Sequence, residues 1–292
     1  MSRYLLLFAL IMIPLATAKA SPNAGSRSRP TPTPAATEVY GTASDGTPLE
    51  WTVYAPAGKG PWPAVLVIHG GFFISGDASE AGPLACARDL AAAGYIAFSI
   101  NYRLAPPGSL PGPSSLGRFP DQPADVHLAV QAARNDPRTT GKVGAVGGSS
   151  GASHAAWVAA TGAAGNDRLE VAVCLSGFYD FSDLRANSQV HLVIRTVTNY
   201  VGVPSTDLTA LRAASPAWVL TRSVAPLFLV DSTNDLIPSV QLDDMAAQLN
   251  AAGVGNYEAV TLPGNLHSFD YWPQIKDDAI AFLSSVLNAP GR

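Results

Sequence analysis

The residues best suited to chemistry form a short run of glycine and serine, residues 147–151 with the sequence Gly-Gly-Ser-Ser-Gly. This run fits the pattern Gly-x-Ser-x-Gly. Only Ser149 has glycine two positions before and two positions after it, because Ala152 stands where Ser150 would need a glycine. A serine in this pattern can stand on a sharp turn with its hydroxyl presented as a nucleophile. The same string also occurs in turns without chemistry, so its surroundings must decide between the two interpretations.

The segments on either side of this run predict a strand followed by a helix. Val143, Ala145 and Val146 form a short apolar run before it, and the small residues 152–160 follow it. A strand-to-helix junction is the setting in which the pattern carries a nucleophile, and the first turn of the helix offers unpaired N–H groups, among them that of Ser150.

A serine hydroxyl needs a neighbouring imidazole to remove its proton, and the imidazole needs a carboxylate to orient it. Two loops after predicted strands supply both groups: one holds Asp231 and Asp235, and the other holds His267. The carboxyl ends of parallel strands meet at one edge of a sheet, so we expect Ser149, Asp235 and His267 to form a catalytic triad there. Asp231 directly ends its strand and remains the alternative acid.

Four other histidines compete with His267 for the role of base. His127 and His191 fall in helical patterns, and His154 lies on the helix after the serine, where we expect it to point away from the turn. His69 follows a buried strand and opens a second glycine-containing loop, residues 69–73. We expect backbone N–H groups of this loop and of Ser150 to hold an oxyanion, each contributing on the order of 3 kcal/mol.

Strands alternate with helices along most of the chain, which predicts an α/β fold with a mostly parallel central sheet and helices on both faces. The first two strands, residues 38–43 and 49–55, read as an antiparallel hairpin. The further strands are expected at residues 63–68, 95–100, 143–146, 171–175, 227–230 and 257–262. Helices are expected at residues 80–93, 124–135, 152–160, 190–201 and 208–214, and around 242–249 and 275–286. The loop 107–120 and the segment 181–225 are expected to shape the substrate site.

The composition excludes several classes of function. The chain has 292 residues with 47% hydrophobic residues and a net charge of −4, which suits one large domain without a basic face for nucleic acid. Neither nucleotide-binding nor zinc-binding patterns are present, so we expect no cofactor and no metal. Cys86 and Cys174 are more easily read as buried free thiols than as a disulfide. We expect a monomer whose partner is a small-molecule substrate.

The N-terminus has the pattern of a secretory signal peptide. Arg3 precedes an apolar run at residues 4–15, and residues 18–20 match a small-x-small cleavage site. Residues 21–37 are rich in Pro and Ser and read as a disordered leader. We therefore divide the chain into a signal peptide (1–20), a leader (21–37) and a catalytic domain (38–292), without a membrane span in the mature protein, and expect it to be secreted or periplasmic.

Several of these motifs together resemble the α/β-hydrolase family of serine esterases, near hormone-sensitive-lipase-like carboxylesterases and feruloyl/acetyl-xylan-esterase-like enzymes. The matching residues are 67–72 (Val-Ile-His-Gly-Gly-Phe), 101–106 (Asn-Tyr-Arg-Leu-Ala-Pro), Phe119-Pro120 with Asp125, 147–151, 214–216 (Ala-Ser-Pro), 234–238 (Asn-Asp-Leu-Ile-Pro) and 264–267 (Gly-Asn-Leu-His). The resemblance extends from about Tyr40 to the C-terminus. It implies an α/β-hydrolase fold in which Ser149 is the nucleophile, Asp235 the acid and His267 the base.

The resemblance also implies an oxyanion hole made by the amides of Gly71, Phe72 and Ser150, with Gly70 as a further contributor. His69 would then brace this loop. The chain departs from the family at Phe72, where a third glycine is common, and at residue 107, where proline replaces the usual glutamate of the lipase-like branch. No cap of helices precedes the first strand, so a small or absent cap is expected.

These observations favour a secreted serine carboxylic-ester hydrolase for small or short-chain acyl esters, acting through an acyl-enzyme. An amidase or peptidase on the same fold is the first alternative. A catalytically inactive binding module is the second, and it would normally lack one triad residue. The sequence does not distinguish short acyl, feruloyl, acetylated-polysaccharide and polyester substrates.

Overall fold

The computed structural model describes residues 34–106, 117–183 and 191–287. The expected signal peptide, most of the expected leader and residues 107–116 of the long loop lie outside this part of the chain.

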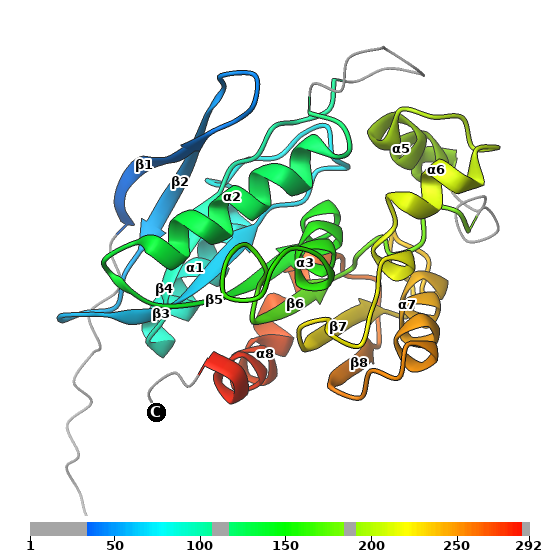
Figure 1. Cartoon of the computed structure of the whole chain (residues 1–292). Coiled ribbons are helices and arrows are strands. Elements are labelled where there is room, and N and C mark those ends of the chain that lie inside the picture. Colours follow the sequence, from blue (N-terminus) through cyan, green and yellow to red (C-terminus); the bar gives the residue numbers. More distant parts are fainter. Residues whose placement is uncertain (1–33, 107–116, 184–190, 288–292) are drawn as a thin grey trace, which may run out of the picture. The chain divides into compact units, whose positions relative to one another are not determined.

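A single sheet of eight strands organises the described domain, in the order β1-β2-β4-β3-β5-β6-β7-β8 (Figure 1). The first two strands and β4 pair antiparallel, and every pair from β4 to β8 is parallel. The strands are β1 (Pro34–Thr42), β2 (Pro48–Tyr54), β3 (Trp62–Ile68), β4 (Ile96–Ile100), β5 (Thr139–Gly148), β6 (Val171–Leu175), β7 (Leu227–Ser232) and β8 (Tyr257–Leu262). The predicted mostly parallel sheet with its antiparallel hairpin is confirmed.

Helices cover both faces of the sheet, which explains why the central strands are apolar on both sides. The apolar side chains of α2 (Asp121–Asn135), α3 (Ser150–Ala160) and α7 (Val240–Ala251) form the core on one face. Those of α1 (Ala81–Ala93) and α8 (Trp272–Leu287) form the core on the other (Figure 1).

A third, smaller apolar cluster joins loops that leave the carboxyl ends of the strands to the segment between β6 and β7. This segment contains α5 (His191–Val201), α6 (Leu208–Ala213) and the 3-10 helix η1 (Pro216–Trp218). The cluster contains Phe73 from the loop after β3, Phe178 from the loop after β6, and Tyr200 from α5. The short helices expected in residues 181–225 are therefore present, and they pack beside the loops that carry the candidate site.

Several element boundaries differ from expectation, and three of the differences have a clear physical reason. β1 begins at Pro34 and not at residue 38, because backbone pairing with β2 extends to Pro34. α2 begins at Asp121 and not at residue 124, since Pro123 falls in its first turn, where a proline is tolerated. β5 begins at Thr139, before its apolar part, because Thr139 pairs with Trp62.

Both cysteines are buried free thiols, as predicted. Cys86 belongs to the core under α1 and α8, and Cys174 belongs to the core on the opposite face of the sheet, so the two cannot form a bridge. Among the described helices, none has the length and apolarity needed to cross a bilayer.

Candidate active site

Ser149 stands on a sharp turn between the end of β5 and the start of α3. Its backbone has φ 55° and ψ −121°, a conformation that non-glycine residues rarely adopt. The N–H of Ser149 donates to the carbonyl of Leu175 on the neighbouring strand at 2.7 Å, and its own carbonyl accepts from Ala152 N–H at 2.9 Å. Only 4% of Ser149 is exposed, so the sheet and the helix together hold the strained turn in place.

The glycines around Ser149 are required by space as well as by conformation. A Cβ atom on Gly147 would overlap the carbonyl of Gly151, and one on Gly151 would overlap the carbonyl of Ile68. A Cβ on Gly148 would overlap the hydroxyl of Ser268. The glycines of the pattern are therefore needed because the end of β3, the turn of Ser149 and the loop after β8 approach one another closely.

The loops after β7 and β8 bring an acid and a base together. His267 donates from Nδ1 to Oδ1 of Asp235 at 2.6 Å, which leaves Nε2 as the proton acceptor. The N–H of Ile237 donates to the same oxygen at 2.9 Å, and the hydroxyl of Ser176 donates to Oδ2 at 2.6 Å. Burial is the largest single influence on Asp235 and would raise its pKa. The hydrogen bonds from His267, Asp231 and Ser176 and the charge of His267 together outweigh burial, so the net shift of the pKa is downward and Asp235 stays ionised.

Asp231, the alternative acid, occupies a different environment. It lies within β7 with 3% of its surface exposed, and its carboxylate accepts from the N–H of Ser232 at 2.8 Å. Burial and the neighbouring carboxylate of Asp235 raise the pKa of Asp231 to about 8. The structure thus brings Asp235 into contact with His267 and leaves Asp231 beside the pair as a carboxylic acid.

The residues next to the nucleophile and the base bring their two loops together. Gly148 lies directly against Ser268, the neighbour of His267. Among the described residues, no hydrogen bond between the Ser149 hydroxyl and His267 is recorded. Serine–histidine contacts are often long in ligand-free enzymes and shorten when substrate binds.

The loop after β3 turns sharply beside Ser149. A Cβ on Gly70 would lie 3.0 Å from the Cβ of Ser149, so the loop backbone borders the nucleophile directly. Gly71, Phe72 and Phe73 have φ angles of 118°, 55° and 64°, which makes three successive left-handed residues. Within the described part of the chain, no acceptor is recorded for the N–H groups of Gly70, Gly71, Phe72 or Ser150, so these donors can serve a ligand.

His69 and Tyr102 brace this loop from beneath. The Nδ1 of His69 donates to the carbonyl of Gly70 at 2.7 Å, and its ring stacks on Tyr102 at 4.4 Å between ring centres. The Tyr102 hydroxyl donates to the His69 carbonyl at 2.9 Å. Burial lowers the pKa of His69, which fits a neutral structural imidazole and not a catalytic base.

His154 is also a structural residue. It is 1% exposed, its Nε2 lies 2.8 Å from Oε1 of Gln122, and burial followed by the nearby His69 lowers its pKa to about 3. Gln122 in turn donates to the carbonyl of Phe73 at 2.7 Å and thereby ties the loop after β3 to α2. No local pattern indicates a role for Gln122, because its partners Phe73 and His154 lie far from it in the chain.

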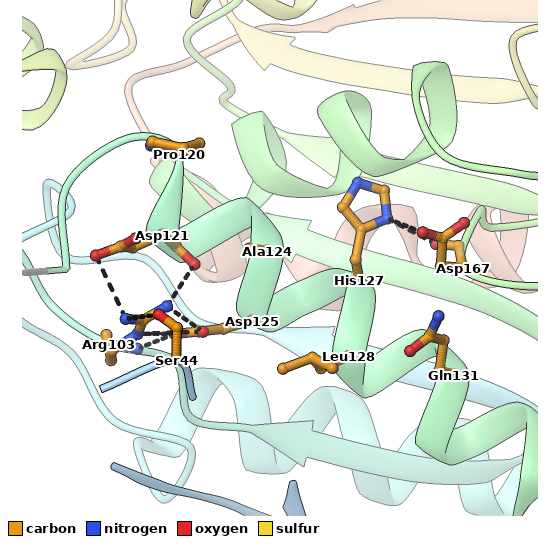
Figure 2. A pocket seen from close by; sticks show the side chains of 10 residues that line it. All are labelled: Ser44, Arg103, Pro120, Asp121, Ala124, Asp125, His127, Leu128, Gln131 and Asp167. Atoms are coloured by element: carbon orange, nitrogen blue, oxygen red, sulfur yellow. Dashed lines mark hydrogen bonds and ion pairs between the residues drawn. The ribbon is translucent and has the colours of Figure 1, made fainter. Parts of the chain in front are cut away.

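Arg103 fixes the exit from β4. Its guanidinium contacts Asp125 at 2.7 Å, Asp121 at 3.3 Å and Asp45 at 3.5 Å. The guanidinium of Arg103 borders, with Asp121 and Asp125, a cavity of about 420 Å³ beside α2 (Figure 2). Figure 2 shows His127 at the other end of the cavity, turned toward Asp167. None of the triad residues lines this cavity, and its charged groups pair with one another, so we interpret it as structural. Over the described residues, no group of three or more His, Cys, Asp or Glu side chains is placed to hold a metal ion.

Comparison with known proteins places this geometry in a family. The family model BD-FAE matches residues 52–249, a range that includes Ser149 and Asp235 and ends before His267. Esterase LipC of Mycobacterium tuberculosis is 26% identical over 235 residues, which cover 72% of this chain and 54% of that protein. The chain therefore spans about half the length of this curated relative.

Solved structures share the fold. A truncated form of a carbohydrate esterase from gut microbiota superimposes with a TM-score of 0.73 at 19% identity, covering 88% of this chain and 98% of that one. Thermogutta terrifontis esterase 2 phosphorylated by paraoxon superimposes with a TM-score of 0.68 at 19% identity, covering 90% of this chain and 97% of that one. Together with the family match over residues 52–249, the fold shows that this chain belongs to the BD-FAE family of α/β-hydrolase esterases.

Proposed function

We propose that this protein is a serine carboxylic-ester hydrolase that acts on small or short-chain acyl esters through an acyl-enzyme. One observation carries the proposal. A serine held in a strained turn borders a loop with free N–H donors, and the neighbouring loop presents a histidine already oriented by a buried carboxylate. Acyl transfer requires a nucleophile, a base and an oxyanion site together.

The reaction follows from these positions. The Oγ of Ser149 attacks the ester carbonyl carbon while its proton passes to Nε2 of His267. The N–H groups of Gly71, Phe72 and Ser150, with Gly70 alongside, stabilise the carbonyl oxygen as it becomes negative. The C–O bond breaks, the alcohol leaves with the proton from His267, and Ser149 carries the acyl group. Water then gives a proton to His267 and attacks the acyl carbon, and the acid leaves as Ser149 recovers its proton.

Asp235 supports both halves of this cycle. Its carboxylate accepts a hydrogen bond from the Nδ1–H of His267 and stabilises the imidazolium that forms after each proton transfer. The low pKa of Asp235 keeps it charged over the range in which esterases work.

The position of the Phe72 side chain supports the proposal that the substrates carry short acyl groups. Its ring packs against the apolar cluster that includes Phe178, Phe181 and Ile237, and it stands in the loop that borders Ser149. A ring in place of hydrogen at this position takes up space beside the reacting carbonyl, which disfavours long acyl chains.

The experiment is hydrolysis of p-nitrophenyl acetate, butyrate and octanoate by protein that begins at Ser21, with the p-nitroanilide of acetic acid as the amide counterpart. We expect rates to fall from acetate to octanoate and the anilide to be cleaved far more slowly. Preference for the anilide would favour the amidase alternative. Failure of a folded protein to cleave any of the four compounds would favour the inactive binding module.

A further inference from the structure

Among the described residues, the non-glycine residues with strained, positive φ angles cluster at the candidate active site. Five non-glycine residues have a positive φ, namely Phe72, Phe73, Ser149, Ser176 and Ser268. Two belong to the loop with the oxyanion donors, one is the nucleophile and one follows the base. Non-glycine residues held in the left-handed region persist only where the surroundings demand it, and they cluster at functional sites. Ser176 is the one of the five without a role so far.

Ser176 is the first residue after β6 and has a φ of 57°, with 1% of its surface exposed. Its N–H donates to the carbonyl of Val230 on β7 at 2.8 Å. Glycine adopts this conformation without strain, so a serine here keeps a side chain at a backbone cost.

The hydroxyl of Ser176 uses its full hydrogen-bonding capacity. Its proton goes to Oδ2 of Asp235 at 2.6 Å, since an ionised carboxylate can only accept. Its lone pairs accept from the N–H of Ser268 at 2.9 Å and face the hydroxyl of Tyr271 at 2.6 Å. The Tyr271 proton is shared with the carbonyl of Val230, which lies 2.9 Å away.

Through hydrogen bonds, the end of β6 contacts two triad residues directly and the neighbour of the third. The carbonyl of Leu175 accepts the N–H of Ser149, and the hydroxyl of Ser176 holds the carboxylate of Asp235. The same hydroxyl also holds the backbone of Ser268, the residue next to His267. Two consecutive residues therefore set the position of the nucleophile, the acid and the base relative to one another.

We propose that Ser176 is a positioning residue for the ester hydrolysis described above, and that its hydroxyl fixes the Asp235 carboxylate and the start of the His267 loop. The proposal rests on the proposed function. Of the two oxygens of Asp235, Oδ1 serves His267, and Oδ2 has Ser176 as its hydroxyl donor. Without that donor the carboxylate can rotate about its Cβ–Cγ bond, and the His267 ring loses its fixed orientation toward Ser149.

The test compares Ser176→Gly and Ser176→Ala with the wild-type enzyme on p-nitrophenyl acetate. The glycine variant removes the hydroxyl and the strain, and the alanine variant removes only the hydroxyl. A misplacement of about 1 Å in a catalytic group costs on the order of 10²-fold in rate, so we expect kcat to fall about 10- to 100-fold in both variants. We expect KM to stay within about threefold of wild type, because the hydroxyl has no contact with substrate.

A spectroscopic readout separates positioning from a general loss of structure. Because the bond between His267 and Asp235 is short, we expect the Nδ1 proton of His267 to resonate at the far-downfield end of the proton NMR spectrum. We expect this resonance to move upfield or broaden in both Ser176 variants, while the signals of the two cores are unchanged.

Two matched controls remove other buried hydroxyls. Ser99→Ala deletes a fully buried hydroxyl on β4 that donates to the carbonyl of Ala78 at 2.7 Å, and activity should stay within about threefold of wild type. Tyr271→Phe deletes the second hydroxyl of the network but leaves the bond from Ser176 to Asp235, so its effect on kcat should be clearly smaller than that of Ser176→Gly.

Each result decides the proposal. A Ser176→Gly variant with kcat within threefold of wild type overturns it, as does an equal loss of kcat in Tyr271→Phe. If neither Ser176 variant folds while Ser99→Ala does, the hydroxyl is needed for folding and the positioning role is rejected.

The rate at which paraoxon labels Ser149 gives a measure of its reactivity that does not depend on turnover. A wild-type protein that is labelled but hydrolyses no ester contradicts the proposed function, and slower labelling of the Ser176 variants still supports the role of Ser176.

Discussion

Asp231 lies near the end of β7 and Asp235 lies in the loop that follows, yet their surroundings give the two carboxyl groups different protonation states. Asp235 receives hydrogen bonds from His267, Ile237 and Ser176, which stabilise its charge. Asp231 has one backbone N–H donor and a charged neighbour, so its proton is retained. Asp235 is therefore the charged carboxylate that orients His267, and Asp231 is a neutral carboxylic acid beside it.

This separation predicts opposite results for two similar substitutions. Asp235→Asn should lower kcat on the order of 10³-fold or more, because the amide favours the wrong tautomer of the imidazole. Asp231→Asn should leave kcat within about threefold, because an amide resembles a protonated carboxyl in shape and in its ability to donate. Steady-state kinetics on p-nitrophenyl acetate measures both. A large loss in Asp231→Asn with an active Asp235→Asn would transfer the role of acid to Asp231.

The raised pKa of Asp231 also predicts how stability depends on pH. In the folded protein this pKa rises from its ordinary value of 3.8 to about 8, so between these values the unfolded chain releases a proton that the folded chain keeps. The contribution of Asp231 to the free energy of unfolding then falls as pH rises through this range. Asp231→Asn removes this effect, so its stability relative to wild type should improve from pH 4.5 to pH 8. Urea unfolding at both pH values tests this, and a constant difference would refute it.

Much of the residue-scale chemistry was predictable because each triad residue carries a reactive side chain and lies on the turn or loop that follows a recognisable strand. Local sequence patterns indicate the roles of Ser149, His267 and the glycines of the loop after β3. Ser176, Gln122 and Tyr102 do not, since their roles come from hydrogen bonds to residues distant in the chain. The assignment of Asp235 needed both the sequence and the structure. The sequence contains two candidate carboxylates, and the fold determines which of them contacts His267.

At the scale of elements, the buried pair Arg103–Asp125 ties the exit of β4 to α2 (Figure 2). The Asp125 side chain is fully buried, so Arg103→Leu leaves a charge without its partner. We expect the free energy of unfolding to fall by about 3–5 kcal/mol at pH 7. The loss should be smaller at pH 4, because burial already raises the pKa of Asp125 and protonation removes the unpaired charge.

Chemical denaturation of Arg103→Leu measures this, with Arg88→Leu as the control. Arg88 is an exposed residue of α1 that lies 5.9 Å from the ring of Tyr54, and its loss should cost less than about 1 kcal/mol. Equal effects of the two substitutions would show that the buried pair contributes no more than a surface contact.

Most elements were predictable because their apolar periodicity is strong. The errors lie at ends where periodicity carries no information. β1 extends to Pro34 through pairing with β2, and β5 starts at Thr139 beside Trp62, and both extensions depend on a neighbouring strand. Strand pairing is a property of the sheet, so a window of sequence cannot show it.

At the scale of the whole molecule, the order of strands places the ends of β3, β5, β6, β7 and β8 along one edge of the sheet. The alternation of strands and helices predicted this arrangement, and with it the meeting of the loops. The packing of the helices between β6 and β7 against Phe73 was not predictable from the sequence, since these contacts join aromatic rings from α5 and from two separate loops.

We further propose that the first twenty residues direct export and are removed. The cleavage site at residues 18–20 predicts a mature protein that begins at Ser21. Expression of the full chain in a secreting bacterial host, followed by intact mass measurement of the exported protein, tests this. Ala18→Asp combined with Ala20→Asp should block processing, and an unprocessed wild-type chain in the cytoplasm would contradict the proposal.

The central claim is that Ser149 forms a covalent bond with the substrate during hydrolysis. The most direct measurement treats the protein with paraoxon and locates the diethyl phosphoryl group by mass spectrometry of peptides. We predict a single adduct on the peptide that contains Ser149, loss of ester hydrolysis in proportion to labelling, and neither labelling nor hydrolysis in Ser149→Ala. An adduct on another residue, or ester hydrolysis that survives in Ser149→Ala, would contradict this account.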